Sequence, residues 1–204
     1  MQNLDKVLDD IHSIRRQVAR STEFRGYGPA TLAGTAAMAL VASALQKRLL
    51  PDPANHLAQY LILWLTTAAL ASSAAGAQMY TRSRRLHSSM SDEMIQMAVG
   101  QFLPSVGASL LLTFVLFRFV PENVWMLPGI WQIVFSLGIF ASCRFLPKPM
   151  LAAGAWYLLT GLVCIALGDN RALSPWAMGI PYAIGQSLVA GVLYFAAQEV
   201  GDEA

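Results

Sequence analysis

Apolar runs of about 20 residues, the length that a membrane-crossing helix needs, recur along the chain and limit its fold more than any other feature. At a rise of about 1.5 Å per residue, a helix of that length crosses a hydrocarbon core of about 30 Å. Of the 204 residues, 55% are hydrophobic and 13% are charged, whereas soluble domains carry roughly 25% charged residues. The sequence therefore predicts an integral membrane protein.

Six such runs are predicted within a transmembrane domain at residues 29–198. Polar or proline-containing segments separate them, and the stretch from Thr81 to Glu93 is expected to be the longest loop because it is too hydrophilic to enter the bilayer. We expect spans at about residues 30–46, 57–79, 94–117, 125–143, 150–167 and 176–197. The predicted fold class is all-α, a polytopic bundle of about six transmembrane helices.

Lysine and arginine residues are distributed unevenly between the two sets of loops. With a cytoplasmic N-terminus, ten of them lie on the cytoplasmic side and four lie outside. The outer four are Lys47, Arg48, Arg118 and Arg171. Positively charged loops are retained in the cytoplasm, so this bias predicts that both termini are cytoplasmic, including an acidic tail at residues 199–204.

Residues 1–28 are predicted to form a cytoplasmic amphipathic helix, which no membrane span requires. Its apolar residues fall at the a and d positions of a heptad: Leu4, Val7, Ile11, Ile14 and Val18. This face predicts docking on a protein partner or on a second copy of the chain. Two alternatives stay open, namely docking on the protein's own cytoplasmic loops and a position in the membrane interface with arginines towards the lipid headgroups.

Three prolines fall in the first third to half of predicted spans, and a glycine follows each within four residues. They are Pro104, Pro128 and Pro181. Each removes a backbone hydrogen bond, so a helix break of this kind can expose carbonyl groups to a solute or an ion. The alternatives are a kink that neighbouring helices relieve and, for Pro128 and Pro181, a place in the first turn of the helix.

Polar side chains within the spans are almost all neutral, and glutamine is prominent among them. Gln101, Gln132 and Gln186 lie near the three prolines. They either converge as an intramembrane polar cluster or hold helices together by hydrogen bonds. No Asp, Glu, Lys or His lies in the middle of a span, which disfavours proton-coupled and ion-coupled pumps.

Small residues repeat at every fourth position on the second and sixth spans. The two sets are Ala68, Ser72 and Gly76, and Ala183, Ser187 and Gly191. Such faces let helix backbones approach closely, but they also arise by chance in Ala-rich spans. Trp64, Trp131 and Trp156 lie deep in their spans, and we expect them to pack inside the bundle.

Known catalytic and metal-binding patterns are not readable in the chain. His12, His56 and His87 lie in three different segments, and none has a second metal ligand at helical spacing. No glycine loop that would cradle a phosphate appears, and the basic residues lack the aromatic neighbours of a nucleic-acid surface. We therefore expect no catalytic residues, no cofactor, no metal and no direct binding of nucleic acid.

Several segments resemble a family of small multi-spanning bacterial membrane proteins. They are residues 14–29, the QFLP segment at 101–104, WMLPGIW at 125–131 and ASCRFLP at 141–147. The resemblance extends over most of the chain and implies the same architecture in the bacterial inner membrane. The family has no assigned activity, so the resemblance implies no site residues.

These observations favour a non-enzymatic sensor, scaffold or regulatory partner that acts through protein contacts, with membrane lipids around it. The alternative is a small transporter or channel for a neutral or weakly polar solute, lined by the proline-containing spans and their glutamines. A core in which every polar group is paired would argue against that alternative.

Overall fold

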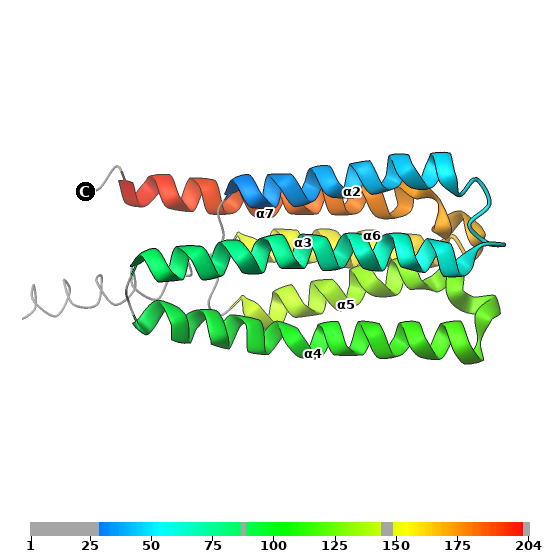
Figure 1. Ribbon diagram of the computed structural model, residues 1–204, viewed down its shortest axis with the longest axis horizontal. Coiled ribbons are helices and arrows are strands. Elements are labelled where there is room, and N and C mark those ends of the chain that lie inside the picture. Colours follow the sequence, from blue (N-terminus) through cyan, green and yellow to red (C-terminus); the bar gives the residue numbers. More distant parts are fainter. Residues whose placement is uncertain (1–28, 87–88, 144–148, 202–204) are drawn as a thin grey trace, which may run out of the picture.

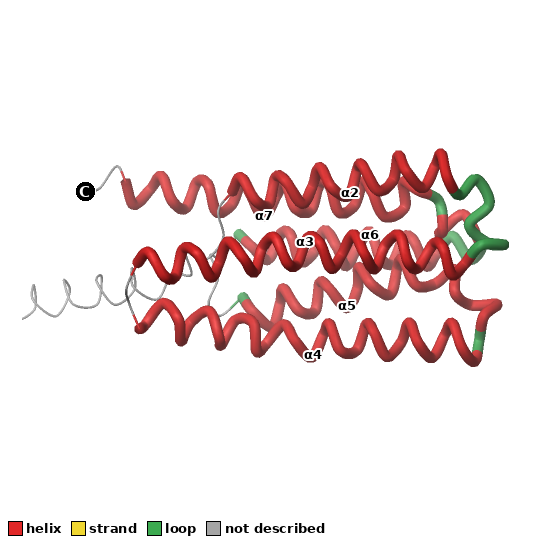
Figure 2. The backbone as a smooth tube through the Cα atoms, in the orientation of Figure 1, coloured by secondary structure: helices red, strands yellow, loops and turns green. Residues whose placement is uncertain are grey.

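The computed structural model describes residues 29–86, 89–143 and 149–201. It contains six long helices, each of which runs antiparallel to the next one along the chain (Figures 1 and 2). They are α2 (Pro29–Leu49), α3 (Leu57–Leu86), α4 (Ser89–Phe119), α5 (Leu127–Ser142), α6 (Met150–Ala166) and α7 (Pro175–Gly201). Two short 3-10 helices, η1 (Pro121–Met126) and η2 (Asn170–Leu173), precede α5 and α7. The described chain is 90% helical and contains no strand, so the predicted all-α fold class is confirmed.

The chain passes up and down the bundle, so that α2 begins and α7 ends at the same end (Figure 1). Segments 50–56, 120–126 and 167–174 lie together at the opposite end, which we name the loop end. The most extensive helix contacts join α2 to α7 and α5 to α6, whereas α3 and α4 contact each other sparsely. Helices α3 and α4 are therefore held mainly by α2 and α5, respectively.

Four segments are long and apolar enough to cross a membrane. They are Leu57–Gln78, Val99–Phe119, Pro121–Ser142 and Pro175–Phe195. Helix α6 is apolar but has 17 residues. The 21-residue α2, which is rich in Ala, does not belong to this set. All four segments lie within the predicted transmembrane domain.

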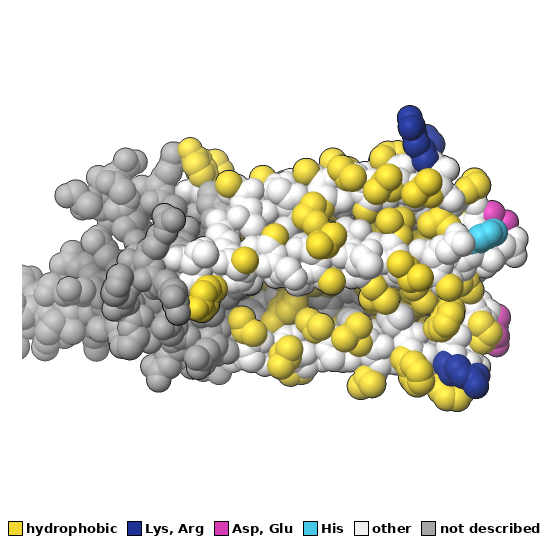
Figure 3. Space-filling model, in the orientation of Figure 1, with side chains coloured by type: hydrophobic (Ala, Val, Ile, Leu, Met, Phe, Trp, Pro, Cys, Tyr) yellow, Lys and Arg dark blue, Asp and Glu magenta, His cyan; other side chains and the backbone are white. Residues whose placement is uncertain are grey.

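Among the residues whose side chains the structure places, which do not include residues 82–98 and 196–204, the charged side chains lie at the loop end, and the flank of the bundle seen in Figure 3 carries apolar side chains. They are Lys47, Arg48, Asp52, Arg118, Glu122, Asp169 and Arg171. An uncharged flank is what contact with lipid tails requires, because an ion in the hydrocarbon region loses its hydration.

The expected loop from Thr81 to Glu93 is wrong, because α3 continues to Leu86 and α4 already begins at Ser89. Hydropathy marks where a helix leaves the lipid, which is not where the helix has to end. Arginine has a high helix propensity, so a polar segment that contains arginines can continue a helix outside the lipid. Polar residues therefore extend both helices beyond the apolar span.

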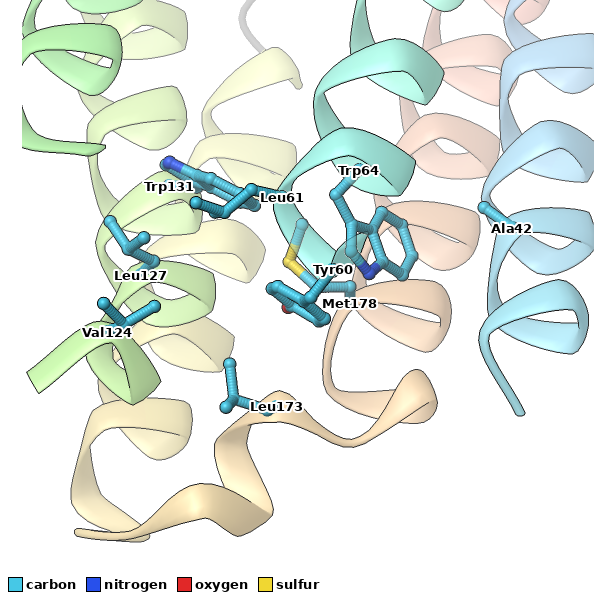
Figure 4. Close-up of a cluster of buried hydrophobic side chains, with 9 residues drawn as sticks. All are labelled: Ala42, Tyr60, Leu61, Trp64, Val124, Leu127, Trp131, Leu173 and Met178. Carbon is cyan, nitrogen blue, oxygen red and sulfur yellow. The ribbon is translucent and has the colours of Figure 1, made fainter. Parts of the chain in front are cut away.

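The bundle core consists of two clusters of buried side chains. The first lies at the loop end and includes Tyr60, Trp64, Leu127, Trp131 and Met178 (Figure 4). The second joins α2, α5, α6 and α7 further along the bundle and surrounds Tyr157. Large aromatic side chains thus fill the space between the helices at both levels.

The small-residue face predicted on the second span makes little contact within the chain, whereas on the sixth span Ser187 is exposed and Ala183 and Gly191 are half-buried. Ala68, Ser72 and Gly76 are all exposed, and a Cβ atom at Gly76 or Gly191 would meet nothing within 4 Å. Close backbone approach occurs instead between α5 and α6, where Gly129 and Gly161 face each other.

Candidate functional site

Gln132 on α5 is fully buried and links α5 to α7. Its Nε2 donates a hydrogen bond to the carbonyl oxygen of Ala177 at 2.9 Å. In an α-helix that carbonyl would accept the N–H of residue 181, but Pro181 lies inside α7 and has no N–H. The Gln132 amide therefore replaces the hydrogen bond that the proline removes.

Gln186 on α7 links its helix to α6 and α2. Its Nε2 donates to the hydroxyl of Tyr157 at 3.3 Å. The hydroxyl of Thr35 lies 3.3 Å from Gln186 Oε1 and 2.8 Å from the Leu32 carbonyl. Since a hydroxyl has one proton, Thr35 divides it between these two acceptors. Gln186 thus serves as a contact between helices.

Gln101 on α4 has different surroundings from the other two glutamines. Its Oε1 is buried and has no hydrogen-bond partner within the described protein. No hydrogen bond found in the described residues joins Gln101, Gln132 or Gln186 to one another. Each amide lies in its own environment, so these side chains do not make a shared hydrogen-bonded cluster.

The three prolines occupy two kinds of position. Pro128 is in the first turn of α5, where the missing N–H needs no partner. Pro104 and Pro181 lie inside α4 and α7. For Pro181, the Gln132 amide on the neighbouring helix α5 supplies the hydrogen bond that the proline removes, as expected for a proline kink that a neighbouring helix relieves.

Sequence reasoning missed Gln46, a fully buried amide whose nitrogen and oxygen both have hydrogen-bond partners. It is 0% exposed, its Nε2 donates to the Leu173 carbonyl at 2.7 Å, and its Oε1 accepts the indole N–H of Trp64 at 2.8 Å. Gln46 thereby joins α2, α3 and η2. Its position beside Lys47 made it look like the boundary of a span, and no local pattern distinguishes it.

The deep tryptophans donate hydrogen bonds between helices as well as filling space. Trp64 and Trp131 are buried, which confirms their predicted packing, and Trp156 is half-buried. The indole N–H of Trp131 donates to the Thr113 hydroxyl at 2.8 Å, and that of Trp156 donates to the Pro181 carbonyl at 2.9 Å. Each tryptophan therefore ties its own helix to another one.

Two fully buried polar atoms at the loop end, the Tyr60 hydroxyl and Gln132 Oε1, have no hydrogen-bond partner within the described protein. Leaving such a group unpaired costs about 1–3 kcal/mol. The described core is therefore not fully paired, and this region is the candidate functional site.

No group of three His, Cys, Asp or Glu side chains that could hold a metal ion is found among the described residues. The predicted docking face on the N-terminal helix lies outside the described residues.

The apolar helices and the hydrogen bonds between them define a class: the chain is an integral membrane protein folded as a polytopic helix bundle. It matches no protein-family model, no curated protein and no solved structure.

Proposed function

We propose that this protein is a non-enzymatic sensor, scaffold or regulatory partner of the bacterial inner membrane that acts through contacts with other proteins. Its termini are cytoplasmic in this proposal, as the distribution of lysine and arginine favours. The N-terminal amphipathic helix supplies one docking surface. The membrane-facing side of α3 and α4 supplies another.

The exposure of α3 and α4 carries the proposal. Of their apolar spans, 17% and 6% of the residues are buried within the chain, against 50% for the span that contains α5 and 33% for α7. On α3 the exposed surface includes the small residues Ala68, Ser72 and Gly76. Helices associate in lipid by close packing rather than by hydrophobic transfer, so a small face allows another helix to approach.

The use of the buried amides supports the same proposal. Gln46, Gln132 and Gln186 bind groups on other helices of the bundle. Amides used in this way stabilise helix packing.

A photo-crosslinking amino acid at Ser72 tests the proposal in native membranes. The matched control is the same amino acid at Leu159 on α6, which is also exposed. We expect a discrete adduct with one polypeptide, or with a second copy of the chain, from Ser72 and none from Leu159. Replacing Gly76 by Leu should abolish that adduct because the face becomes too bulky. Adducts with lipid alone from both positions would contradict the proposal.

A small transporter or channel for a neutral solute is the second candidate, favoured by the unpaired polar atoms of Tyr60 and Gln132. The transporter hypothesis would be supported if glycerol or urea entered proteoliposomes faster than it entered vesicles without protein. A rate equal to that of the vesicles would argue against it.

A further inference from the structure

Pro104 leaves one main-chain carbonyl of α4 without a hydrogen-bond donor. In an α-helix the carbonyl of Gly100 accepts the N–H of residue 104, and a proline has no N–H. Both residues are exposed, and no hydrogen bond from a described side chain to this carbonyl is found. At Pro181, in contrast, the Gln132 amide supplies the donor from within the bundle. Because lipid tails offer no donor, the Gly100 carbonyl requires one from another molecule.

Ser72 on α3 carries the complementary group. It is exposed within the apolar span Leu57–Gln78, and no hydrogen bond of its hydroxyl is found in the described part of the chain. The exposed Ser187 on α7 differs, because its hydroxyl donates to the Ala183 carbonyl of its own helix at 2.7 Å. Helix α3 therefore presents an unused donor, and α4 presents an unused acceptor.

The two groups lie at the same depth in the bundle. Helices α3 and α4 lie side by side, and Leu57 begins α3 at the loop end where Phe119 ends α4 (Figure 1). Ser72 follows Leu57 by 15 residues, and Pro104 precedes Phe119 by 15 residues. Each is thus about 22 Å from the loop end of its helix at a rise of 1.5 Å per residue.

Small exposed residues on both helices match in depth in the same way. Ala68 and Ala108 each lie 11 residues from the loop end of their helix, and Gly76 and Gly100 each lie 19 residues from it. A Cβ atom at Gly76 or Gly100 would meet nothing within 4 Å. Two such faces let an α3 and an α4 approach closely enough for a hydrogen bond between a side chain and the main chain.

We propose that two copies of the chain associate in the membrane by packing α3 of each against α4 of the other, with the Ser72 hydroxyl donating to the Gly100 carbonyl. A rotation of 180° about the membrane normal keeps every residue at its depth. Because α3 and α4 are neighbours on one flank, this rotation forms both contacts at once, as a symmetric dimer requires. The dimer rests on the proposed function and names a second copy as the partner of the α3 face.

Disulfide cross-linking between two differently tagged copies in native membranes tests the match in depth. Both copies carry Cys143→Ser and Cys164→Ser, one carries Ala68→Cys, and the other carries Ala108→Cys. We expect oxidation to give a dimer that contains both tags. The matched control uses Val115→Cys in place of Ala108→Cys, because Val115 is exposed on α4 about two turns nearer the loop end. Equal yields from the two pairs, or no dimer from either pair, overturn the proposal.

Energy transfer between two labelled preparations of the full-length protein in liposomes tests the hydrogen bond. Pro104→Ala gives the Gly100 carbonyl an N–H from its own helix, and Ser72→Ala removes the donor. We expect each change to weaken association by roughly 3- to 30-fold, and both together by no more than either alone. Ser187→Ala is the control, because that hydroxyl is already bonded within its helix. Unchanged association in Pro104→Ala and Ser72→Ala overturns the proposal.

The photo-crosslinking amino acid at Ser72 separates the dimer from the proposed function. An adduct that contains a different polypeptide and no second copy overturns the dimer, while the proposed function stands. Adducts with lipid alone overturn both.

Discussion

Gln132 on α5 supplies the hydrogen bond that Pro181 removes from α7. The Gln132 Nε2 atom lies 2.9 Å from the Ala177 carbonyl, one turn before the proline. Pro181 and Gln132 thus act as a pair on two helices. The free-energy cost of the helix hydrogen bond lost at Pro181 depends on whether the Gln132 amide is present.

Gln132→Met keeps the length of the side chain and leaves the Ala177 carbonyl without its partner. We expect the free energy of unfolding to fall by about 1–3 kcal/mol, measured by reversible denaturation in detergent micelles. In a Pro181→Ala background the alanine N–H can bond the same carbonyl, so the cost of Gln132→Met should shrink. The double-mutant cycle should give a coupling of about 1 kcal/mol.

Pro104→Ala is the control for this cycle, because Pro104 lies inside α4, on a different helix. The cost of Gln132→Met should be the same with and without that substitution. Additive effects of Gln132→Met and Pro181→Ala would show that the amide does not compensate for the proline.

Gly129→Ala should destabilise the bundle. The new Cβ atom would lie 2.7 Å from the carbonyl oxygen of Gly161, which is backbone and cannot turn away. We expect a loss of about 1–3 kcal/mol in the free energy of unfolding. Gly191→Ala is the matched control, since its Cβ atom meets nothing within 4 Å and alanine is favoured over glycine in a helix by up to about 1 kcal/mol. Equal effects of the two substitutions would contradict this account of the α5–α6 contact.

The helices and the deep tryptophans were predictable from sequence because apolar length and depth are properties of a single segment. The surroundings of Gln46 and Tyr60 were not predictable. They depend on how each helix is rotated about its own axis, and in a membrane both the lipid-facing and the core-facing sides are apolar, so hydropathy does not reveal the rotation. For the same reason, the small face of α3 could not be assigned to the interior or to the lipid.

The pKa of Asp169, in the segment at the loop end, is lowered mainly by the hydrogen bonds of the Arg171 side chain and also by the Arg171 backbone N–H. Arg171→Gln should therefore raise this pKa towards its ordinary value, measured by NMR titration of the carboxyl group. Because the pKa is depressed in the folded state, the contribution to stability is present at neutral pH. It is lost as the pH falls through the lowered pKa. An unchanged pKa in Arg171→Gln would show that the ion pair does not form in solution.

Cysteine labelling tests the proposed orientation. In a variant in which Cys143 and Cys164 are replaced by Ser, cysteines introduced at Asn123 and Asn170 should react with a membrane-impermeant reagent in intact cells. Cysteines at Ser83 and Ser89 should react only after the inner membrane is permeabilised. The reverse pattern would place the loop end in the cytoplasm and overturn the proposed orientation.

The hydrogen bonds from Gln132 and Gln46 to main-chain carbonyls also fix the vertical register of the bundle. Apolar helices in lipid can slide past one another with little loss of contact, because one turn of leucine and alanine resembles the next. A slip of one turn, about 5.4 Å, would carry the Gln132 amide from a carbonyl that lacks a helical partner to one that already has one. Pro181 on α7 therefore sets the height at which α5 packs against α7.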